Sequence, residues 1–179
     1  MMTPLNFRSS RRFLLFGGAS SLLMAACSSG PARSEENLKP NVGENPSGID
    51  WASLTEDEWR ERLSPEAFRV LRKEDTERPF SSPLNDETRE GVFHCAGCDL
   101  PLFSSETKYK SGTGWPSFWK PLDGAMGTKA DNKLWMQRTE YHCIRCGGHQ
   151  GHVFDDGPEP TGQRWCNNGV ALTFKPANA

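Results

Sequence analysis

The six cysteines of the chain fall into groups whose spacing indicates different chemistry. Four of them form two Cys-x-x-Cys pairs, Cys95 with Cys98 and Cys143 with Cys146. A two-residue spacer lets both sulfurs of a pair face one ion at about 2.3 Å, and two such pairs complete a tetrahedral thiolate site with no position left open for catalysis. We therefore predict one structural zinc ion bound by these four residues.

Two other interpretations of the Cys-x-x-Cys pairs remain open. In an oxidising compartment the pairs could form disulfides. They could also belong to a zinc ribbon that binds nucleic acid or a partner protein. The chain has 21 basic and 23 acidic residues, a formal charge of -2, and no basic stripe beside the pairs. This acidic balance argues against a polyanionic partner, so we expect no nucleic acid to bind.

Cys166 stands outside both pairs, in the run from Arg164 to Asn168. A single cysteine is most often a small buried hydrophobe. If the run is a strand, alternation places Arg164 and Asn168 on the same face as the sulfur, unless Gly169 introduces a bulge. A nearby cation favours the thiolate, which is the nucleophilic form. We predict that Cys166 is a catalytic nucleophile, that Arg164 activates it and that Asn168 holds a polar substrate atom.

Two histidines, His149 and His152, follow directly after the second cysteine pair. Either could be a structural residue or an alternative zinc ligand. If a metal holds the start of this loop, both imidazoles could instead be brought to one point beside the thiol. There they would act as a fixed acid that protonates a poor leaving group of the substrate.

An aromatic loop runs from Gly112 to Trp119 and contains Trp115, Phe118 and Trp119. Aromatic clusters are usually part of a core. The Gly-Thr-Gly-Trp-Pro order is nevertheless typical of a loop, and two tryptophans with a phenylalanine could form an apolar box around a thioether methyl group. Methionine carries such a group.

The elements that position these residues can also be predicted from local patterns. Thr55 with Glu58 makes a capping box, and Ser64 followed by Pro65 gives a second helix start, so two short helices open the domain. The remainder has short apolar and aromatic runs between Gly, Pro, Asn and Asp, which predicts short antiparallel strands. The clearest strand spans residues 169–174.

The N-terminal 27 residues have the features of an export signal. The pair Arg11-Arg12 precedes an apolar run to Ala26 that is short for a permanent membrane span. Residues 10–15 resemble a twin-arginine signal, and residues 24–27 resemble a bacterial lipobox in which Cys27 is lipidated. The alternatives are an ordinary cleaved signal peptide and an uncleaved anchor. We predict export to the bacterial cell envelope, with membrane contact only through a lipid on Cys27.

The segment 28–50 links this signal to the domain. It is rich in Gly, Pro, Ser, Asn and Glu and has almost no apolar residues. Such a segment cannot bury enough surface to offset the entropy lost on ordering. We predict a disordered tether over 28–50 and a single domain over 51–179.

The segment from about Trp51 to Phe174 resembles the B-type methionine sulfoxide reductases, which act on the R epimer. The matching runs, besides both Cys-x-x-Cys pairs, are Arg78-Pro79-Phe80-Ser81, Gly114 to Phe118, Gly151 to Phe154, Asp156-Gly157-Pro158, and Arg164 to Asn168 with the strand after it. The resemblance implies a mainly β fold of two small antiparallel sheets, β-tent-like, with short N-terminal helices and a zinc site remote from the active centre.

The resemblance also implies residue roles and partners. Cys166 would be the nucleophile, Trp115 the wall that holds the substrate methyl group, His152 and His149 the acid and water-binding pair, and Asn168 a substrate-positioning group. The substrate would be oxidised methionine in proteins, and Cys166 would become a sulfenic acid. A cysteine peptidase and a zinc-stabilised binding module are the rival functions.

One position departs from a common pattern of the family. Many members carry a second, resolving cysteine directly before Gly-Trp-Pro-Ser-Phe, and this chain has Thr113 there. With four cysteines assigned to zinc and Cys27 to a lipid, no internal thiol is left to react with the sulfenic acid. We therefore predict recycling by an external, thioredoxin-like thiol donor, and a monomeric enzyme.

Overall fold

The computed structural model describes residues 45–132 and 137–178. Two short helices open this part of the chain, α1 (Glu56–Arg62) and α2 (Pro65–Lys73). The predicted capping box is confirmed, because Thr55 Oγ1 accepts from Glu58 N at 3.3 Å while the Glu58 carboxylate accepts from Thr55 N at 2.7 Å. At the start of α2 the Ser64 hydroxyl caps the helix by accepting from Ala67 N at 3.1 Å. These bonds satisfy N–H groups that a helix start otherwise leaves without partners.

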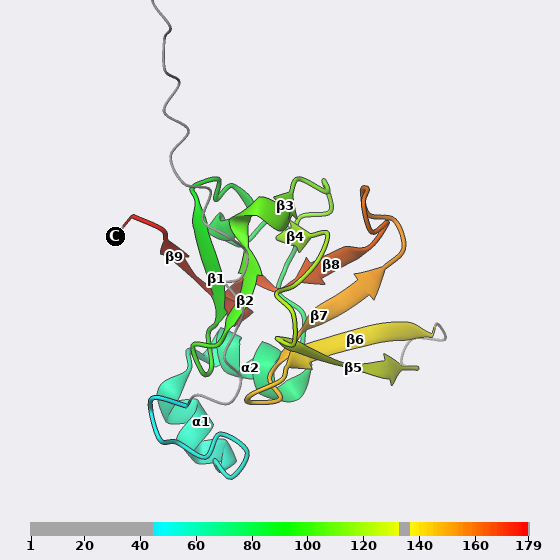
Figure 1. Cartoon of the computed structure of the whole chain (residues 1–179). Coiled ribbons are helices and arrows are strands. Elements are labelled where there is room, and N and C mark those ends of the chain that lie inside the picture. Colours follow the sequence, from blue (N-terminus) through cyan, green and yellow to red (C-terminus); the bar gives the residue numbers. More distant parts are fainter. Residues whose placement is uncertain (1–44, 133–136, 179) are drawn as a thin grey trace, which may run out of the picture. The chain divides into compact units, whose positions relative to one another are not determined.

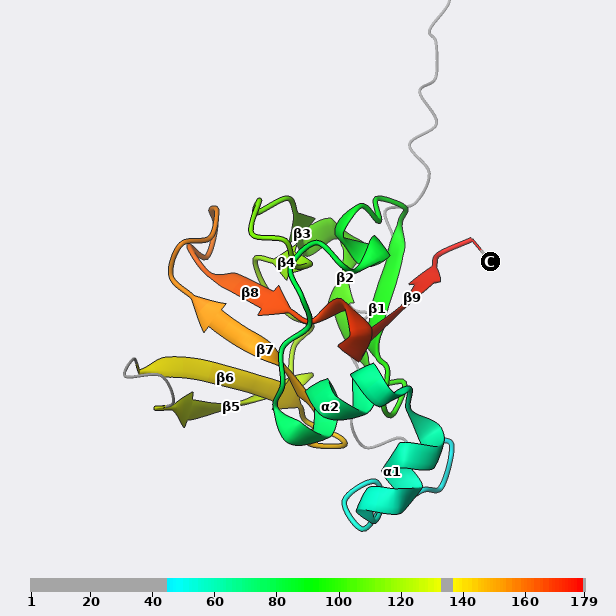
Figure 2. The same ribbon diagram turned by 180° about the vertical axis from the view of Figure 1, so that it is seen from behind.

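Two antiparallel sheets make up most of the remainder, which confirms the predicted fold class (Figures 1 and 2). One sheet has three strands in the order β2-β1-β9, and the other has six in the order β3-β4-β8-β7-β6-β5. The strands are β1 (Gly91–Cys95), β2 (Pro101–Ser104), β3 (Lys108–Tyr109), β4 (Ser117–Phe118), β5 (Met126–Asp131), β6 (Arg138–Cys143), β7 (His149–Phe154), β8 (Arg164–Asn167) and β9 (Leu172–Pro176).

Aromatic rings pack between the two sheets. The ring of Phe118 on β4 stacks on Phe103 of β2, with centroids 4.0 Å apart, and meets the edge of Phe93 on β1 at 5.0 Å. All three side chains are fully buried. Burying a side chain of this size stabilises a fold by about 1.5–3 kcal/mol. Phe118 therefore belongs to the core, and the prediction that it helps to form a substrate box is wrong.

The predicted strand over residues 169–174 is partly wrong. Gly169–Ala171 form a 3-10 turn, and β9 begins only at Leu172. The cause is Glu77, whose carboxylate accepts the backbone N–H groups of Gly169 at 2.6 Å and Val170 at 2.9 Å. These bonds turn the chain out of one sheet and into the other. A contact between residues so far apart in sequence leaves no local pattern.

Several predictions fall on residues that the structure does not describe. The export signal, Cys27 and residues 28–44 of the tether lie outside the described ranges, so the domain boundaries stay predictions. Within residues 45–132 and 137–178, no helix combines the length and the apolar character needed to cross a membrane.

Candidate active site

A row of polar side chains crosses one face of the six-stranded sheet. Ser117 on β4 lies opposite Cys166 on β8, Cys166 lies opposite His152 on β7, and His152 lies opposite Glu140 on β6. Directly opposed residues of antiparallel strands point to the same face. The register of the sheet therefore places the Cys166 thiol between a hydroxyl and an imidazole.

His149 reaches this face through a β-bulge. Residues three apart on a regular strand point to opposite faces. The pairing of β6 with β7 shifts by one residue, however, so that His152 lies opposite Glu140 and His149 lies opposite His142, with Gln150 as the extra residue. The two imidazole centroids are 5.5 Å apart. The structure thus brings together the two histidines that the sequence singled out.

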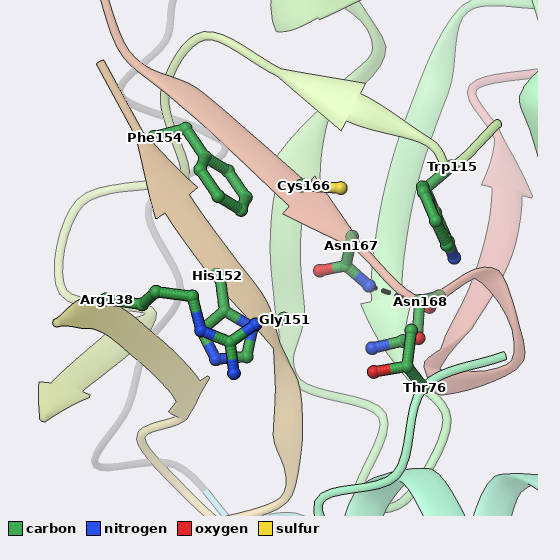
Figure 3. Close-up of a pocket in the computed structure, with 9 residues that line it drawn as sticks. All are labelled: Thr76, Trp115, Arg138, Gly151, His152, Phe154, Cys166, Asn167 and Asn168. Carbon is green, nitrogen blue, oxygen red and sulfur yellow. Dashed lines mark hydrogen bonds between the residues drawn. The ribbon is translucent and has the colours of Figure 1, made fainter. Parts of the chain in front are cut away.

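A pocket of about 140 Å³ opens over this row (Figure 3). Figure 3 shows Trp115 and Phe154 on opposite sides of Cys166, where they form two aromatic walls. The pocket is lined by Thr76, Trp115, Arg138, Gly151, His152, Phe154, Cys166, Asn167 and Asn168. Of the predicted catalytic residues, His149 and Arg164 do not line it. Trp119 and Phe118 do not line it either, so Trp115 and Phe154 provide its aromatic walls.

The Cys166 thiol is partly exposed and keeps its proton more readily than an ordinary cysteine. Burial raises its pKa, and this outweighs the opposing effects of the Arg164 charge and of hydrogen bonds with Thr113 and Arg164. Arg164 therefore favours the thiolate, as predicted, but burial outweighs its effect and keeps the pKa of the thiol above its ordinary value. The resting site holds a neutral thiol.

Arg164 is itself held in place by two contacts. It is only 7% exposed. Its Nε and Nη2 donate to the two carboxylate oxygens of Asp156 at 2.8 and 3.0 Å, and its guanidinium lies 4.3 Å from the ring centroid of Phe154. The hydrogen bonds from Arg164 also keep the pKa of Asp156 below its ordinary value. A bidentate pair of this kind orients the guanidinium and the neighbouring pocket wall together.

His152 is oriented by a carboxylate that the sequence did not reveal. Its Nε2 lies 2.8 Å from Asp131 Oδ2, which also accepts from Arg138 Nη2 at 2.7 Å. An ionised carboxylate only accepts, so Nε2 carries a proton. Burial lowers the pKa of His152, and the bond to Asp131 opposes that shift. His152 is thus a neutral imidazole at pH 7 that a carboxylate holds beside Cys166.

His149 is buried behind the pocket. It is 2% exposed, and its Nδ1 lies 2.6 Å from Glu140 Oε1. Burial alone would raise the pKa of Glu140, but hydrogen bonds from His149 and His142 outweigh it and leave that pKa lowered. His149 Nε2 is buried and has no hydrogen-bond partner among the described residues. A buried polar atom of this kind suits an ordered water, and the water-binding role of His149 stays a prediction.

Asn168 lies just beyond the end of β8 and not on the strand itself, so the predicted alternation fails there. Its Nδ2 donates to Gln150 O at 2.9 Å, and its Oδ1 accepts from Glu77 N at 3.0 Å. Trp115 Nε1 donates to Glu77 O at 3.1 Å. The backbone of Glu77 therefore holds two walls of the pocket, Trp115 and Asn168. The Asn168 amide still has one Nδ2–H group and one lone pair on Oδ1 that could bond to a bound molecule.

Comparison with known proteins agrees with this arrangement. The SelR domain family model matches residues 63–176. A peptide methionine sulfoxide reductase MsrB from Agrobacterium fabrum is 50% identical over 120 residues, covering 66% of this chain and 89% of that protein. Another from Pseudomonas putida strain W619 is 54% identical over 123 residues, 68% of this chain and 92% of its own length.

The chain belongs to the MsrB family of peptide methionine sulfoxide reductases. A third relative, an MsrB from Methanosarcina barkeri, is 51% identical over 122 residues, 68% of this chain and 86% of that protein. The resemblance inferred from the sequence motifs is confirmed.

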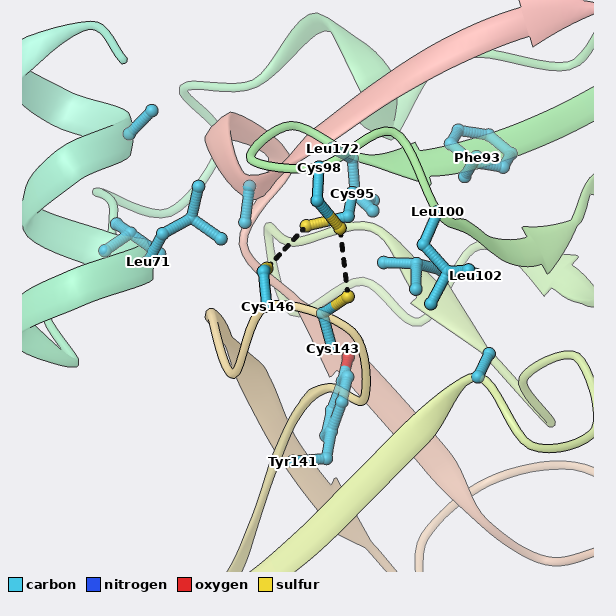
Figure 4. Close-up of a cluster of buried hydrophobic side chains, with 14 of the residues drawn as sticks. Leu71, Phe93, Cys95, Cys98, Leu100, Leu102, Tyr141, Cys143, Cys146 and Leu172 are labelled. Atoms are coloured by element: carbon cyan, nitrogen blue, oxygen red, sulfur yellow. Dashed lines mark hydrogen bonds between the residues drawn. The ribbon is translucent and has the colours of Figure 1, made fainter. Parts of the chain in front are cut away.

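In this MsrB-family chain the four paired cysteines meet in the core (Figure 4). Their sulfurs all lie within 4.8 Å of one another. The Cys95 and Cys146 sulfurs are 3.6 Å apart, and those of Cys98 and Cys143 are 3.5 Å apart. A tetrahedral zinc–thiolate site requires sulfurs about 3.8 Å apart, whereas a disulfide requires about 2.05 Å. The cluster therefore fits a metal ion, and all four thiols are free of disulfides.

The sequence missed the charged partners of the two histidines. Arg138 and Glu140 stand two apart in a polar run, and strand alternation alone could have placed them on one face. Asp131 has no such signal, because its role depends on the pairing of β5 with β6.

Proposed function

We propose that Cys166 is the nucleophile with which this MsrB-family enzyme reduces methionine-R-sulfoxide in proteins to methionine. One observation carries the assignment of the residue. Cys166 is the cysteine, among those described, that stands outside the four-sulfur cluster, and its thiol opens into a pocket with aromatic walls. The family relationship supplies the reaction.

The neutral state of Cys166 suits this reaction. The Cys166 sulfur attacks the sulfoxide sulfur and forms an S–S bond. As the oxygen moves to Cys166, the S–O bond of the substrate and the new S–S bond both break, so that methionine leaves and Cys166 becomes a sulfenic acid. The thiol gives up one proton and the oxygen gains one, so the step needs no net proton. His152, oriented by Asp131, is placed to relay that proton, and protonation turns the oxide into a usable leaving group.

The walls of the pocket account for binding of the substrate side chain. Trp115 and Phe154 offer apolar surface to the methyl group, while Asn168 and His152 offer polar atoms to the sulfoxide oxygen. Only one epimer can place its methyl group against the aromatic walls and its oxygen towards the polar side at the same time. The pocket walls therefore support specificity for a single epimer, and the family relationship indicates that this is the R epimer.

Recycling requires a thiol from another molecule. The other described cysteines are buried together in the cluster, and Thr113 occupies the hydrogen-bonding position beside Cys166. A thioredoxin-type donor would supply two thiols, which become a disulfide while the sulfenic oxygen leaves as water. When the enzyme is treated with one equivalent of methionine sulfoxide and no reductant, Cys166 should become a sulfenic acid that dimedone labels. The Thr113→Cys variant should instead form an intramolecular disulfide; rapid disulfide formation in the unaltered enzyme would refute external recycling.

The four-cysteine cluster is proposed to bind one structural zinc ion, because four thiolates with no open position suit zinc and exclude a bound water. Metal analysis should find about one zinc per chain. Oxidised cysteines without metal would overturn this assignment.

Export to the bacterial envelope is proposed from residues 1–27, with the lipid on Cys27 as the membrane anchor and the folded enzyme a monomer. Cell fractionation of the Cys27→Ser variant should release the enzyme from membranes into the soluble periplasm. If the unaltered chain stays in the cytoplasm, export is contradicted. Light scattering tests the oligomeric state, and a monomer should give the mass of one chain.

The decisive test of function is turnover of the separated R and S sulfoxide epimers, with dithiothreitol as the reductant. We expect activity on the R epimer alone, and none in the Cys166→Ser variant. Incubation with unoxidised peptides tests the rival peptidase function, since a reductase leaves every peptide bond intact.

A further inference from the structure

We propose that a groove beside the catalytic pocket binds the polypeptide on one side of the oxidised methionine and favours an apolar neighbour there. This inference rests on the proposed function. The groove, called the Phe80 groove below, has a volume of about 190 Å³ and is lined by residues from three segments: Phe80 to Asp86, Tyr109 to Gly112, and Gly114 to Pro116.

The size of the catalytic pocket requires such a second site. Pockets that enclose whole small ligands measure about 300–1,000 Å³. The pocket over Cys166 measures about 140 Å³, which is enough for a side chain but not for the backbone that carries it. In a protein substrate the chain on either side of the methionine must therefore run across the surface next to the pocket.

The Phe80 groove is continuous with the pocket because the two share a wall. Trp115 lines both cavities, and its neighbour Pro116 lines the groove. A side chain held against Trp115 in the pocket thus has its own backbone close to the start of the groove. Tyr109 of β3 lines the groove, and β3 is the edge strand of the six-stranded sheet (Figure 1).

Phe80 gives the groove an exposed apolar anchor. It is 74% exposed, more than any other large hydrophobic side chain in the described residues. Its φ is +61°, a left-handed conformation that is unfavourable for an aromatic residue. A strained backbone is kept only where the surroundings impose it, and an exposed aromatic ring held in this way is typical of a binding surface.

The contacts that impose this conformation come from the catalytic loop. Phe80 N donates to Gly114 O at 2.7 Å, and Asn85 Nδ2 donates to the same oxygen at 3.0 Å. A Cβ on Gly114 would lie 2.9 Å from Phe80 N, so only glycine allows this approach. Phe80 is therefore fixed relative to Trp115, the next residue in the loop.

The groove has an apolar centre and a polar rim. It therefore favours a peptide whose apolar side chain enters the centre while the polar backbone contacts the rim. Phe80, Tyr109 and Trp115 supply its apolar surface. Its rim carries the exposed ion pair of Lys110 and Asp86, with Nζ and Oδ1 3.2 Å apart. An apolar centre inside a polar rim is the usual anatomy of a peptide-binding surface.

A second groove leaves the pocket at Thr76 and gives the rival path for the polypeptide. Its lining is largely charged and includes Glu66, Arg69, Asp75 and Arg78. It would favour charged neighbours of the methionine and not apolar ones. The exposed ring of Phe80 makes the Phe80 groove the stronger candidate.

The experiment measures kcat/KM for blocked pentapeptides with methionine-R-sulfoxide at the centre. One peptide has glycine on both sides, and two others have phenylalanine directly before or directly after the methionine sulfoxide. In the unaltered enzyme we expect one of the two phenylalanine peptides to exceed the glycine peptide by about tenfold, the effect of burying much of one ring. In the Phe80→Gly variant that ratio should fall close to one. Glycine suits the left-handed backbone, so this variant should fold.

The matched control is Ile144→Ala, which removes the other exposed large hydrophobic side chain, 44% exposed in the loop between Cys143 and Cys146. It should leave the ratio unchanged. Equal turnover of all three peptides by the unaltered enzyme would overturn the groove while leaving the proposed function intact. Failure to turn over any of them would instead refute the proposed function.

Two other results would also overturn the groove. If Phe80→Gly lowers turnover of all three peptides equally, the ring only supports the catalytic loop. If Arg69→Ala, and not Phe80→Gly, removes the preference, the polypeptide takes the rival path.

Discussion

The four-cysteine cluster and the Cys166 pocket use the same side chain in opposite ways. In the cluster all four cysteines are buried, and their sulfurs lie within 4.8 Å of one another. Cys166 is partly exposed, and its neighbours are the Thr113 hydroxyl and the Arg164 guanidinium. A closed set of four sulfurs stabilises a fold through a metal, whereas an accessible sulfur beside donors can react. Access and neighbours decide the use of a cysteine.

The two regions are nevertheless joined by buried hydrogen bonds. Gln150 Nε2 donates to Cys95 Sγ at 3.4 Å, and Asn167 Nδ2 donates to Gln150 Oε1 at 3.2 Å. Asn167 directly follows Cys166, and Tyr141 Oη donates to its Oδ1 at 2.8 Å. Gln150 is also the bulge residue that turns His149 towards the site. The metal cluster is therefore placed to influence the strand that carries the nucleophile.

The largest effect is expected from Cys143→Ser. Serine is a poor zinc ligand, and metal binding can contribute about 10 kcal/mol to the folding of a domain. That is comparable with the whole stability of a typical domain. The variant should lose zinc, unfold at a temperature lower by more than about 10 °C, and lose activity as a consequence. Metal analysis and thermal unfolding followed by circular dichroism measure this. A variant that keeps its melting temperature without zinc would show that the cluster is not structural.

The same substitution at the other region, Cys166→Ser, should separate activity from stability. Loss of a nucleophile lowers kcat by roughly 10⁴-fold or more. The zinc content should be unchanged, because Cys166 has no role in the cluster. The melting temperature should stay close to that of the unaltered enzyme, within roughly 2 °C. Residual activity above 1% of the original, a threshold set by this ~10⁴-fold expectation, would mean that another residue attacks the sulfoxide.

Asp131→Asn should weaken catalysis without removing a reacting group. The bond to Asp131 raises the pKa of His152, so its loss lowers that pKa further below the ordinary value. If the protonated imidazole takes part in the reaction, activity falls as pH rises through this pKa. The falling limb of the kcat/KM profile should therefore move to lower pH, with about a tenfold loss at pH 7.

The control for that variant is Asp57→Asn, which removes an exposed carboxylate from α1. Its pH profile should match that of the unaltered enzyme. An Asp131→Asn profile that falls in height but keeps its position on the pH axis would indicate that Asp131 holds only the local structure.

The smallest effect, and the most specific to the link between the regions, is expected from Gln150→Leu. Leucine has a similar size but cannot bond to the Cys95 sulfur or to Asn167. We expect a destabilisation of about 1–3 kcal/mol, zinc release to a chelator several times faster, and kcat/KM lower by several-fold. Faster zinc release with unchanged kcat/KM would show that the cluster and the nucleophile act independently.

Local patterns in the sequence were sufficient for several features of this protein. The spacing of the cysteines separates a metal cluster from a single thiol outside it, since a two-residue spacer lets both sulfurs of a pair face one ion. The caps at Thr55 and Ser64 set the starts of both helices, because a capping bond spans only three residues. The loop motif placed Trp115 at the site for the same reason, as glycine and proline act over their immediate neighbours.

Only the tertiary structure decided how these parts work together. The bulge at Gln150 turns His149 and His152 to one face, and Asp131 meets His152 through the pairing of distant strands. Burial reverses the expected shift in the pKa of Cys166, because desolvation is a sum over the whole surroundings and not a property of Arg164 alone. Register, burial and electrostatics join residues far apart in the chain, and a local pattern does not carry that information.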